Sequence, residues 1–285
     1  MRANNECTAC GFTWVYERTA PYVAESMRQG LAEEITRAVY SEPQFTNVGL
    51  LSNRAAYSVT DFESRWSAHY QTFKERSNNQ AERLLPLART YIESGKTEQE
   101  RIERACILAA ASNVAPLGAP SAAFTFPEVT AIVEGITSGI VMGDLYGTIL
   151  AARRVFYVTD NAGEVGFDSL VVRAVKDRGA RVTLVVKEDT FFEDARISDA
   201  RHFHLDELVD EIITSRGFPV PGMLTSRLAD AYGASDVVIA KGTGSFEALK
   251  NETAGKRAIF MLKVKCGPIS RETGVEQGRV LVKVE

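Results

Sequence analysis

Cysteine and histidine are scarce in this chain, which has four cysteines and three histidines in 285 residues. Four cysteines are too few for disulfide bonds to be the main stabilisation of a chain of this length. Only Cys7 and Cys10 are close in sequence, while Cys106 and Cys266 lie far from them and from each other. The histidines have no spacing typical of a zinc finger. A fold built on disulfides is therefore excluded, and the sequence shows no second close pair of ligands for a four-ligand structural zinc site.

The chain also lacks a large excess of charge of one sign. Lys and Arg number 33 and Asp and Glu number 37, which gives a net charge of −4. This balance argues against binding nucleic acid or an anionic membrane through bulk charge. It leaves room for a local basic pocket that takes a small anion.

Long apolar runs of membrane-spanning character are missing as well. The longest charge-free stretch covers residues 105–127, but Asn113, Pro116 and Gly118 interrupt it. A helix broken there would leave backbone groups unpaired in lipid. The first residues, MRANNECTACGF, contain no apolar segment of signal-peptide length. We therefore expect a cytoplasmic protein without a membrane partner, and nothing in the sequence indicates an oligomeric state.

What is present is ordinary globular composition, 45% hydrophobic and 25% charged, with a change of pattern near residue 153. Apolar residues recur every four positions over 23–39 and again over 62–73, as on one face of a helix. Residues 102–111 form an Ala-rich helical pattern, and 129–150 favours one or two helices. We expect residues 1–152 to form an all-helical region.

Residues 153–285 instead alternate between short β-branched runs and helical patterns. Strands are predicted at five places: 155–158, 182–186, 236–240, 258–262 and 279–283. Helices are predicted between them at 167–178, 206–213, 226–232 and 246–251. Continuous apolar strands that alternate with helices indicate a mostly parallel sheet covered on both faces. The predicted fold is thus α/β, a Rossmann-like α/β/α sandwich, with both parts forming one catalytic unit.

Polar side chains follow the first two predicted strands. Asp160 and Asn161 come directly after the first strand, just before Gly163, and Asp189 follows the second. Ligands of such sheets bind beyond the carboxyl ends of the strands. Neighbouring strands lie about 4.8 Å apart, so we expect Asp160, Asn161 and Asp189 to converge and to hold a hard divalent cation. Taken singly, each of these residues is typical of a turn or a helix cap.

A glycine-flanked loop follows the third predicted strand as Lys241-Gly-Thr-Gly-Ser-Phe-Glu247. Free backbone N–H groups at the start of a helix, together with a lysine, suit an anion. The Walker spacing is absent because the lysine precedes the glycines, and no dinucleotide fingerprint follows the first strand. Lys263 and Lys265 add two cations after the next strand. Metal ligands beside lysines are what a metal-assisted phosphoryl-transfer site needs.

At these positions the chain resembles the damage-control phosphatases, a metal-dependent family whose domain is shared with a proposed acidic-residue methyltransferase. The runs that carry the resemblance are DNAGE from Asp160, EDTFFEDA from Glu188, KGTGSFE from Lys241 and LKVKC from Leu262. CTAC at Cys7–Cys10 resembles the Cys-x-x-Cys of the smaller, prokaryotic-type members. The motifs occur in the family's order over nearly the whole chain.

The resemblance implies a phosphatase acting on small phosphomonoesters, such as sugar phosphates or damaged phosphometabolites, with Mg²⁺, Mn²⁺, Co²⁺ or Ni²⁺. It makes Asp160, Asn161 and Asp189 the metal ligands, with Asp189 as the third. It makes the same three residues and Lys241 catalytic, with Lys241 holding the phosphate. Further substrate-binding or phosphate-binding candidates are Asn113, Gly163, Glu164, Gly242, Gly244, Ser245, Glu247 and Lys265.

The sequence departs from the family pattern around this site. The family's GN-x-x-D-x-G run appears as Ser112-Asn113-Val-Ala-Pro116-Leu-Gly118, with proline in place of the acid, and the Asn of KGxGN is Ser245. The loop at 216–222 lacks the acid expected after its glycine. These departures concern the identity of the substrate more than the metal ligands.

Alternatives remain at this level. Either a metal-activated water attacks the phosphate, or Asp160 forms an aspartyl-phosphate. Different classes of function are an S-adenosylmethionine-dependent carboxyl methyltransferase and a non-catalytic metal-binding or phosphometabolite-binding protein. Cys7 and Cys10 could meet Cys266 near the strand ends and form an accessory thiol site.

Overall fold

The computed structural model describes residues 1–40, 47–253 and 255–285. The helices are α1 (Asn5–Thr19), α2 (Arg28–Tyr40), α3 (Val48–Tyr57), α4 (Glu63–Glu93), α5 (Glu98–Ala111), α6 (Pro127–Val133), α7 (Leu145–Ala151), α8 (Glu164–Lys176), α9 (Ile197–His202), α10 (Leu205–Leu208), α11 (Ser226–Ala234), α12 (Gly242–Leu249) and α13 (Gly267–Thr273). The strands are β1 (Ile140–Met142), β2 (Arg154–Val158), β3 (Arg181–Lys187), β4 (Glu211–Ser215), β5 (Val237–Lys241), β6 (Arg257–Lys263) and β7 (Val280–Val284).

The strands form one seven-stranded sheet in the order β1-β7-β6-β5-β2-β3-β4. All neighbouring pairs are parallel except β6 and β7, which are antiparallel. The chain order reverses between β2 and β5, so their carboxyl ends form the switch point at which α/β sheets bind ligands. The predicted α/β fold with a mostly parallel sheet is confirmed.

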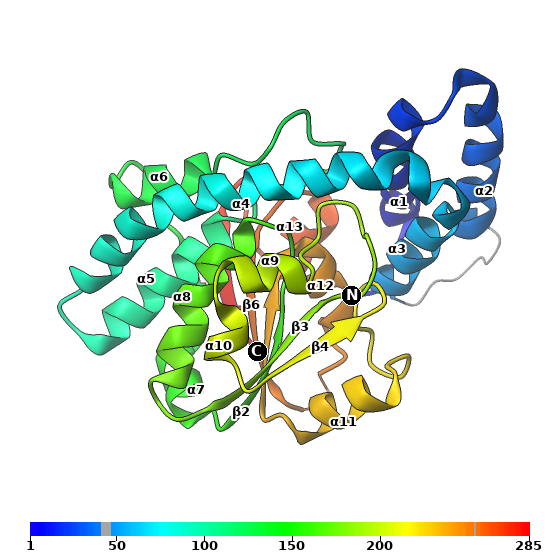
Figure 1. The fold of residues 1–285 in the computed structure, drawn as a ribbon. Helices are drawn as coiled ribbons and strands as arrows, with labels where there is room; N and C mark the ends of the chain where they lie inside the picture. Colours follow the sequence, from blue (N-terminus) through cyan, green and yellow to red (C-terminus); the bar gives the residue numbers. More distant parts are fainter. Residues whose placement is uncertain (41–46, 254) are drawn as a thin grey trace.

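Each face of the sheet packs against its own layer of helices (Figure 1). Alternate residues of β2 show the division: Val155 and Tyr157 belong to the core with α4, α5 and α8, whereas Phe156 and Val158 belong to the core with α1, α3 and α12. This alternation follows from the two-residue period of a strand. Both faces are apolar because both are covered.

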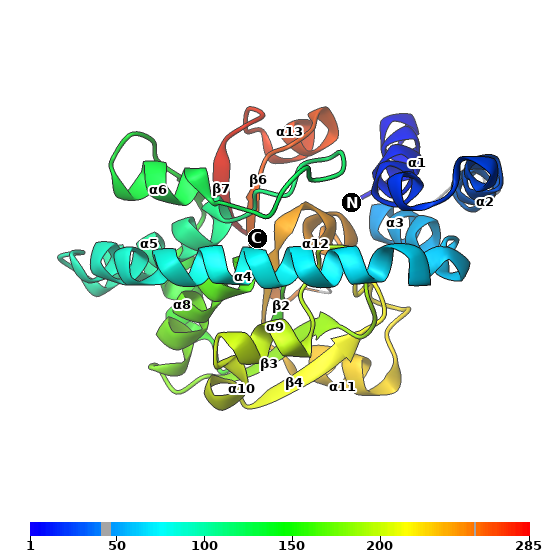
Figure 2. The ribbon, with the colours of Figure 1, turned by 45° about the horizontal axis from the view of Figure 1, so that its top comes forward.

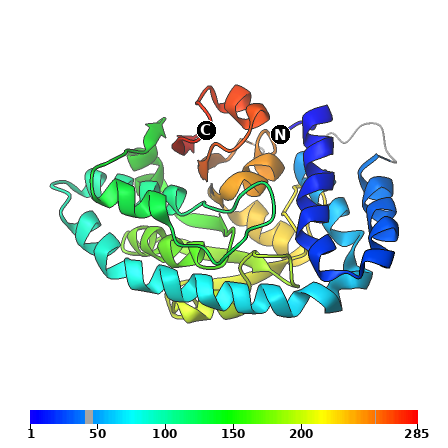
Figure 3. The ribbon, with the colours of Figure 1, turned by 90° about the horizontal axis from the view of Figure 1, so that it is seen from above.

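The helix α4 links the two ends of the molecule. Its 31 residues correspond to a length of about 46 Å. Figures 2 and 3 show it running along one side of the sheet, from the α5 end to the group formed by α1, α2 and α3. The N-terminal helices are thereby held beside α12 and α13, next to the carboxyl ends of the central strands.

Two local predictions are wrong. The pattern over residues 206–213 predicts a helix, but α10 ends at Leu208 and β4 begins at Glu211. The pattern over residues 129–150 predicts helices alone, but Ile140–Met142 forms the edge strand β1 against β7. Because β1 precedes residue 153, the helical part and the Rossmann-like part share one sheet.

Residues 105–127 contain the end of α5 and a loop. Across the described ranges, no helix combines the length and the apolar character needed to cross a membrane.

Candidate active site

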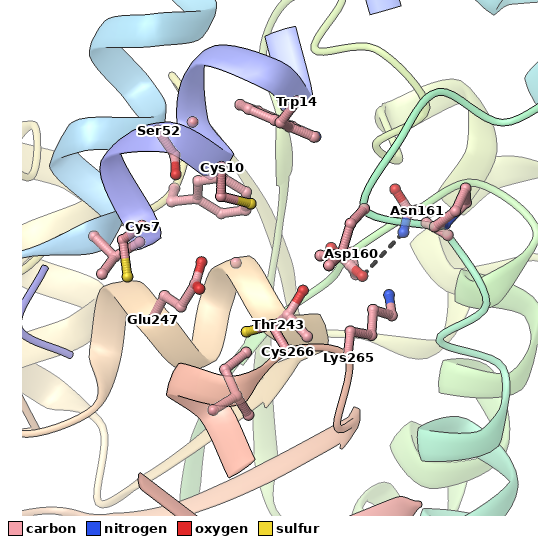
Figure 4. A pocket seen from close by; sticks show the side chains of 18 of the residues that line it. Cys7, Cys10, Trp14, Ser52, Asp160, Asn161, Thr243, Glu247, Lys265 and Cys266 are labelled. Carbon is pink, nitrogen blue, oxygen red and sulfur yellow. Dashed lines mark hydrogen bonds between the residues drawn. The ribbon is translucent and has the colours of Figure 1, made fainter. Parts of the chain in front are cut away.

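A pocket opens at the carboxyl ends of β2, β5 and β6, walled on the other side by α1 and α3 (Figure 4). Asp160 and Asn161 enter it from the loop after β2, Thr243 and Gly244 from the start of α12, and Lys265 from the segment after β6. The residues that line the α1 side include Cys7, Cys10, Trp14 and Arg18. The sheet edge expected from the sequence is therefore the edge that carries the pocket.

Asp160 is held rigidly at the bottom of this pocket. Its Oδ2 atom accepts hydrogen bonds from Asn113 Nδ2 at 2.6 Å and from Asn161 Nδ2 at 3.0 Å. Burial, followed by the negative charges of Glu164 and Asp194, raises the pKa of Asp160 well above its ordinary value. A carboxyl group in this setting favours the arrival of a proton or a cation.

A second buried carboxylate, that of Asp194, reaches the same pocket. The chain leaves β3 at Lys187, turns through Phe192 in the left-handed region at φ 51°, and comes back antiparallel to Asn161. Two backbone bonds fix the return: Ala195 N donates to Asp160 O at 2.8 Å, and Ala162 N donates to Glu193 O at 2.9 Å. Burial raises the pKa of Asp194 to about 6, against the opposing charge of Lys187.

Asp189 lies elsewhere, so its predicted convergence with Asp160 and Asn161 is not found. Its side chain is exposed and lines a small separate hollow beside Tyr57 and Phe191. β3, the second predicted strand, ends at Lys187, one residue beyond the predicted end, and the first acid pair after it turns outward. The second acid pair, Glu193 and Asp194, is the one that returns to the pocket. The run EDTFFEDA, from Glu188, contains Glu-Asp twice, so the sequence itself offers both acid pairs.

The donor set of Asp160, Asn161 and Asp194 fits a hard divalent cation, because it offers carboxylate and amide oxygens. The Oδ2 atom of Asp194 lies 3.1 Å from Lys187 Nζ, yet no described group directs a hydrogen bond at it. Within the described ranges, no three His, Cys, Asp or Glu side chains are grouped so as to hold a metal ion. A set made of two carboxylates and one amide is compatible with that finding.

Lys241 does not face the pocket, contrary to its predicted contact with phosphate. Its side chain is fully buried, and Nζ donates to Ala109 O at 2.5 Å, Ser112 Oγ at 3.1 Å and Glu164 Oε2 at 3.0 Å. These three bonds use all the donors of an ammonium group. Burial alone would lower its pKa, but Asp168, Glu164 and Asp160 outweigh burial and raise it. Lys241 is therefore a buried residue that positions its neighbours below the pocket.

Glu164 and Asn113 belong to the same buried hydrogen-bond network as Lys241. Glu164 accepts hydrogen bonds from Asn161 Nδ2 at 2.8 Å and from Lys241, and it does not line the pocket. Asn113 joins Asp160 to the backbone N–H of Lys263 at 3.2 Å. The chain from Lys241 through Glu164 to Asn161 orients the amide next to Asp160.

Lys265 is the lysine that lines the pocket. It makes no hydrogen bond or ion pair with the residues that the structure describes. Burial lowers its pKa, while Glu164 and Asp160 oppose that effect. A half-buried ammonium without a partner is available to an anion that enters the pocket.

The remaining candidates in the glycine loop differ in position. Gly244 and Glu247 line the pocket, whereas Gly163, Gly242 and Ser245 do not. The N–H of Gly163 donates to Asn78 Oδ1 at 2.6 Å. Ser245 is buried, and its hydroxyl has no hydrogen-bond partner in the described part of the chain.

Gly242 is the first residue of α12, immediately after β5, and lies directly against Asp160. It has φ 79°, and a Cβ atom on it would overlap the Asp160 carboxylate. Gly242→Ala is expected to reduce roughly 10²-fold the phosphatase activity that the family resemblance implies, because it displaces Asp160 and strains the backbone. The measurement is phosphate release at saturating metal. Gly233→Ala is the control, since nothing lies within 4 Å of a Cβ there; equal activities would contradict the tight packing at Gly242.

Cys7, Cys10 and Cys266 all line the pocket, at the end away from Asp160 and close to Glu247 (Figure 4). Burial raises the pKa of Cys7 and Cys266, and it raises the pKa of Cys10 to about 12. The thiols are therefore neutral at pH 7. The predicted meeting of these cysteines near the strand ends is found, but they form no metal-holding group with the described acids.

Sequence reasoning missed three further lining residues. Arg18 is buried and binds Glu193 through Nε at 3.0 Å and Nη2 at 2.6 Å. It also donates to Pro116 O at 3.1 Å and so fixes the loop in which the family has an acid. Trp14 and Phe218 form an aromatic wall with ring centroids 6.4 Å apart. These residues come from distant segments that no sequence motif connects.

Comparison with known proteins identifies a family and several relatives. The family described as "Damage-control phosphatase ARMT1-like domain" matches residues 3–281. A damage-control phosphatase of Archaeoglobus fulgidus is 29% identical over 250 residues, which cover 86% of this chain and 84% of that protein. Damage-control phosphatase PH1575 of Pyrococcus horikoshii is 35% identical over 141 residues, 48% of this chain and 49% of that protein.

The fold also has a solved counterpart. The crystal structure of a DUF89 family protein of Pyrococcus horikoshii superimposes with a TM-score of 0.79 and 21% sequence identity, covering 99% of this chain and 98% of that one. At this identity the likeness concerns the fold.

Proposed function

The chain belongs to the damage-control phosphatase family that carries the ARMT1-like domain, and on that premise we propose that it is a metal-dependent phosphatase of small phosphomonoesters. The observation that carries the proposal is the meeting of two buried carboxylates and an amide, those of Asp160, Asp194 and Asn161, beside the unpaired Lys265. The names of the relatives support a phosphatase role.

Asp160, Asn161 and Asp194 would hold the divalent ion, which we propose to be Mg²⁺, Mn²⁺, Co²⁺ or Ni²⁺. When bound there, the ion would supply Lewis-acid polarisation of a phosphoryl oxygen and a lowered pKa for water. The buried carboxylates have raised pKa values, and this favours their pairing with a cation.

Residues of the chain would then bind the phosphate opposite the carboxylates. Lys265 supplies a positive charge, and the first-turn N–H groups of α12 at Thr243 and Gly244 have no partner within the helix. Such groups stabilise negative charge in a pocket that excludes most water. Lys241 and Glu164 would keep Asn161 and Asp160 in place from below.

The decisive experiment is release of phosphate from a panel of phosphomonoesters, assayed with each of the four metals and with a chelator. We expect metal-dependent turnover by the wild type and none by Asp160→Ala. Undiminished activity of that variant would reject the proposed site. Trapping of a phosphoenzyme, with the phosphate mapped to Asp160, would assign Asp160 as a nucleophile instead of a group that binds only the metal.

Two other functions are outcomes of the same experiment. Binding of S-adenosylmethionine by calorimetry, without phosphate release, would favour a methyltransferase. Metal binding with no turnover across the panel would favour a non-catalytic metabolite-binding protein.

A further inference from the structure

Glu247 is a carboxylate without a partner on the far side of the pocket from Asp160. It lies on α12 and is half-buried, and its side chain extends among Cys7, Cys10 and Cys266 (Figure 4). No hydrogen bond or ion pair joins this carboxylate to the residues that the structure describes. An unpaired charge that is partly removed from water costs free energy, so its presence in a ligand pocket needs an explanation.

The other acidic residues that line the pocket have partners. Glu193 pairs with Arg18, with 2.6 Å between Oε1 and Nη2, and Asp194 pairs with Lys187 at 3.1 Å. Asp160 accepts the amide hydrogen bonds of Asn113 and Asn161. Among the described lining residues, Glu247 is the carboxylate left without a cation or a donor.

The nearest positive charges leave the Glu247 carboxylate unpaired. The Met1 ammonium group donates to the main-chain oxygen of Glu247, not to its side chain. Lys265 lies toward Asp160 (Figure 4). Burial raises the pKa of Glu247 to about 7, and these two cations only partly offset that effect.

The side chains around Glu247 offer few hydrogen bonds to replace those that water would make. The three thiols are neutral and are weak hydrogen-bond donors. Val48 and Ile269 are apolar side chains that line the pocket, and Ser52, which Figure 4 shows near Cys10, adds a single hydroxyl group. A ligand that carried several hydroxyl groups would leave most of them unsatisfied here.

We propose that the pocket selects phosphomonoesters whose alcohol portion carries an ammonium group, and that Glu247 binds this ammonium. The inference rests on the proposed phosphatase function. It assigns the phosphate to the Lys265 and Asp160 end and the ammonium to the thiol-lined end, with the carbon chain of the substrate along the apolar wall.

An ammonium group fits Glu247 better than a hydroxyl group does. It donates hydrogen bonds and also neutralises the carboxylate, whereas a hydroxyl leaves the negative charge buried. Hydrogen bonds between charged groups are stronger than neutral ones. A carboxylate at this position would in turn repel a second phosphate or a carboxylated substrate.

The test is calorimetry of the full chain with Mg²⁺ and two series of non-hydrolysable phosphonates. One series is ω-aminoalkyl phosphonates of two to six carbons, and the other is the alkyl phosphonates in which methyl replaces ammonium. We expect one chain length at which the amino compound binds about tenfold more tightly or better. Glu247→Gln should remove this ratio, and Glu134→Gln, at an exposed position, should keep it.

The outcomes separate the two proposals. Equal affinity of both series for the wild type would overturn the ammonium site, even if alkyl phosphates are hydrolysed as the proposed function requires. A ratio that survives in Glu247→Gln would also overturn it. Binding of neither series, together with no phosphate release from any ester, would reject the phosphate site itself and hence both proposals. Because the wild-type ratio is decisive alone, the test holds if Glu247→Gln fails to fold.

Discussion

Replacing Asp194 with asparagine is expected to lower kcat/KM for phosphomonoester hydrolysis roughly 10³-fold, since the variant loses one of the two anionic ligands that we propose for the metal. Asp194 is buried beside Asp160 and Asn161 in the pocket. The amide keeps the shape of the side chain, so the loss would come from charge. The measurement is phosphate release against metal concentration, where the variant should also need far more metal.

Asp189→Asn is the matched control for this prediction. Asp189 is exposed and lines a different hollow, so its variant should stay within about twofold of the wild type. The opposite result, with Asp189→Asn inactive and Asp194→Asn active, would mean that the segment after β3 adopts another path in the working enzyme. Similar losses in both variants would show that the site draws on the whole segment.

The Asp189 and Asp194 pair shows how far sequence reasoning reaches. The rule that ligands bind at the carboxyl ends of parallel strands identified the edge of the sheet that carries the pocket. It could not identify which acid reaches the pocket, because that choice depends on the turn at Phe192 and on the pairing of Asn161 with Asp194. These are contacts between segments that lie far apart in the chain, and no local spacing encodes them.

Lys241 shows that the sequence also does not reveal which side chains are buried. A lysine before a glycine loop has the sequence signature of an anion site, and here the loop does reach the pocket through Thr243 and Gly244. The lysine itself is the last residue of β5, and its side chain turns under the sheet edge toward α5 and α8. Which face a strand residue takes is set by register with its neighbours, and this register is a tertiary property.

The sequence predicts strands where the apolar signal is continuous, as in β2, β3, β5, β6 and β7. The strand β4 escapes prediction because Glu211-Ile-Ile-Thr-Ser215 follows closely on the short helix α10, so that a single helical pattern covers both. The strand β1 has only three residues and exists through its pairing with β7. Edge strands of this kind carry little sequence signal of their own.

Lys241→Met is expected to lower the free energy of unfolding by about 3–5 kcal/mol, because it leaves buried carboxylates without their counter-charge. Glu164 lies 3.0 Å and Asp168 3.8 Å from Lys241 Nζ, and all three side chains are fully buried. The measurement is urea unfolding followed by circular dichroism, with a chelator present so that metal binding does not contribute.

The variant Lys265→Met distinguishes a lysine that contacts the ligand from a lysine that stabilises the fold. Lys265 has no hydrogen bond or ion pair among the described residues, so its loss should change the free energy of unfolding by no more than about 1 kcal/mol. It should nevertheless reduce kcat/KM about 10²-fold, through the lost charge opposite the phosphate.

If instead Lys241→Met proved stable and lost only its affinity for phosphate, Lys241 would be the phosphate ligand that the sequence suggested. The pocket would then have to open beneath Glu164, since all three donors of Lys241 are now in use there.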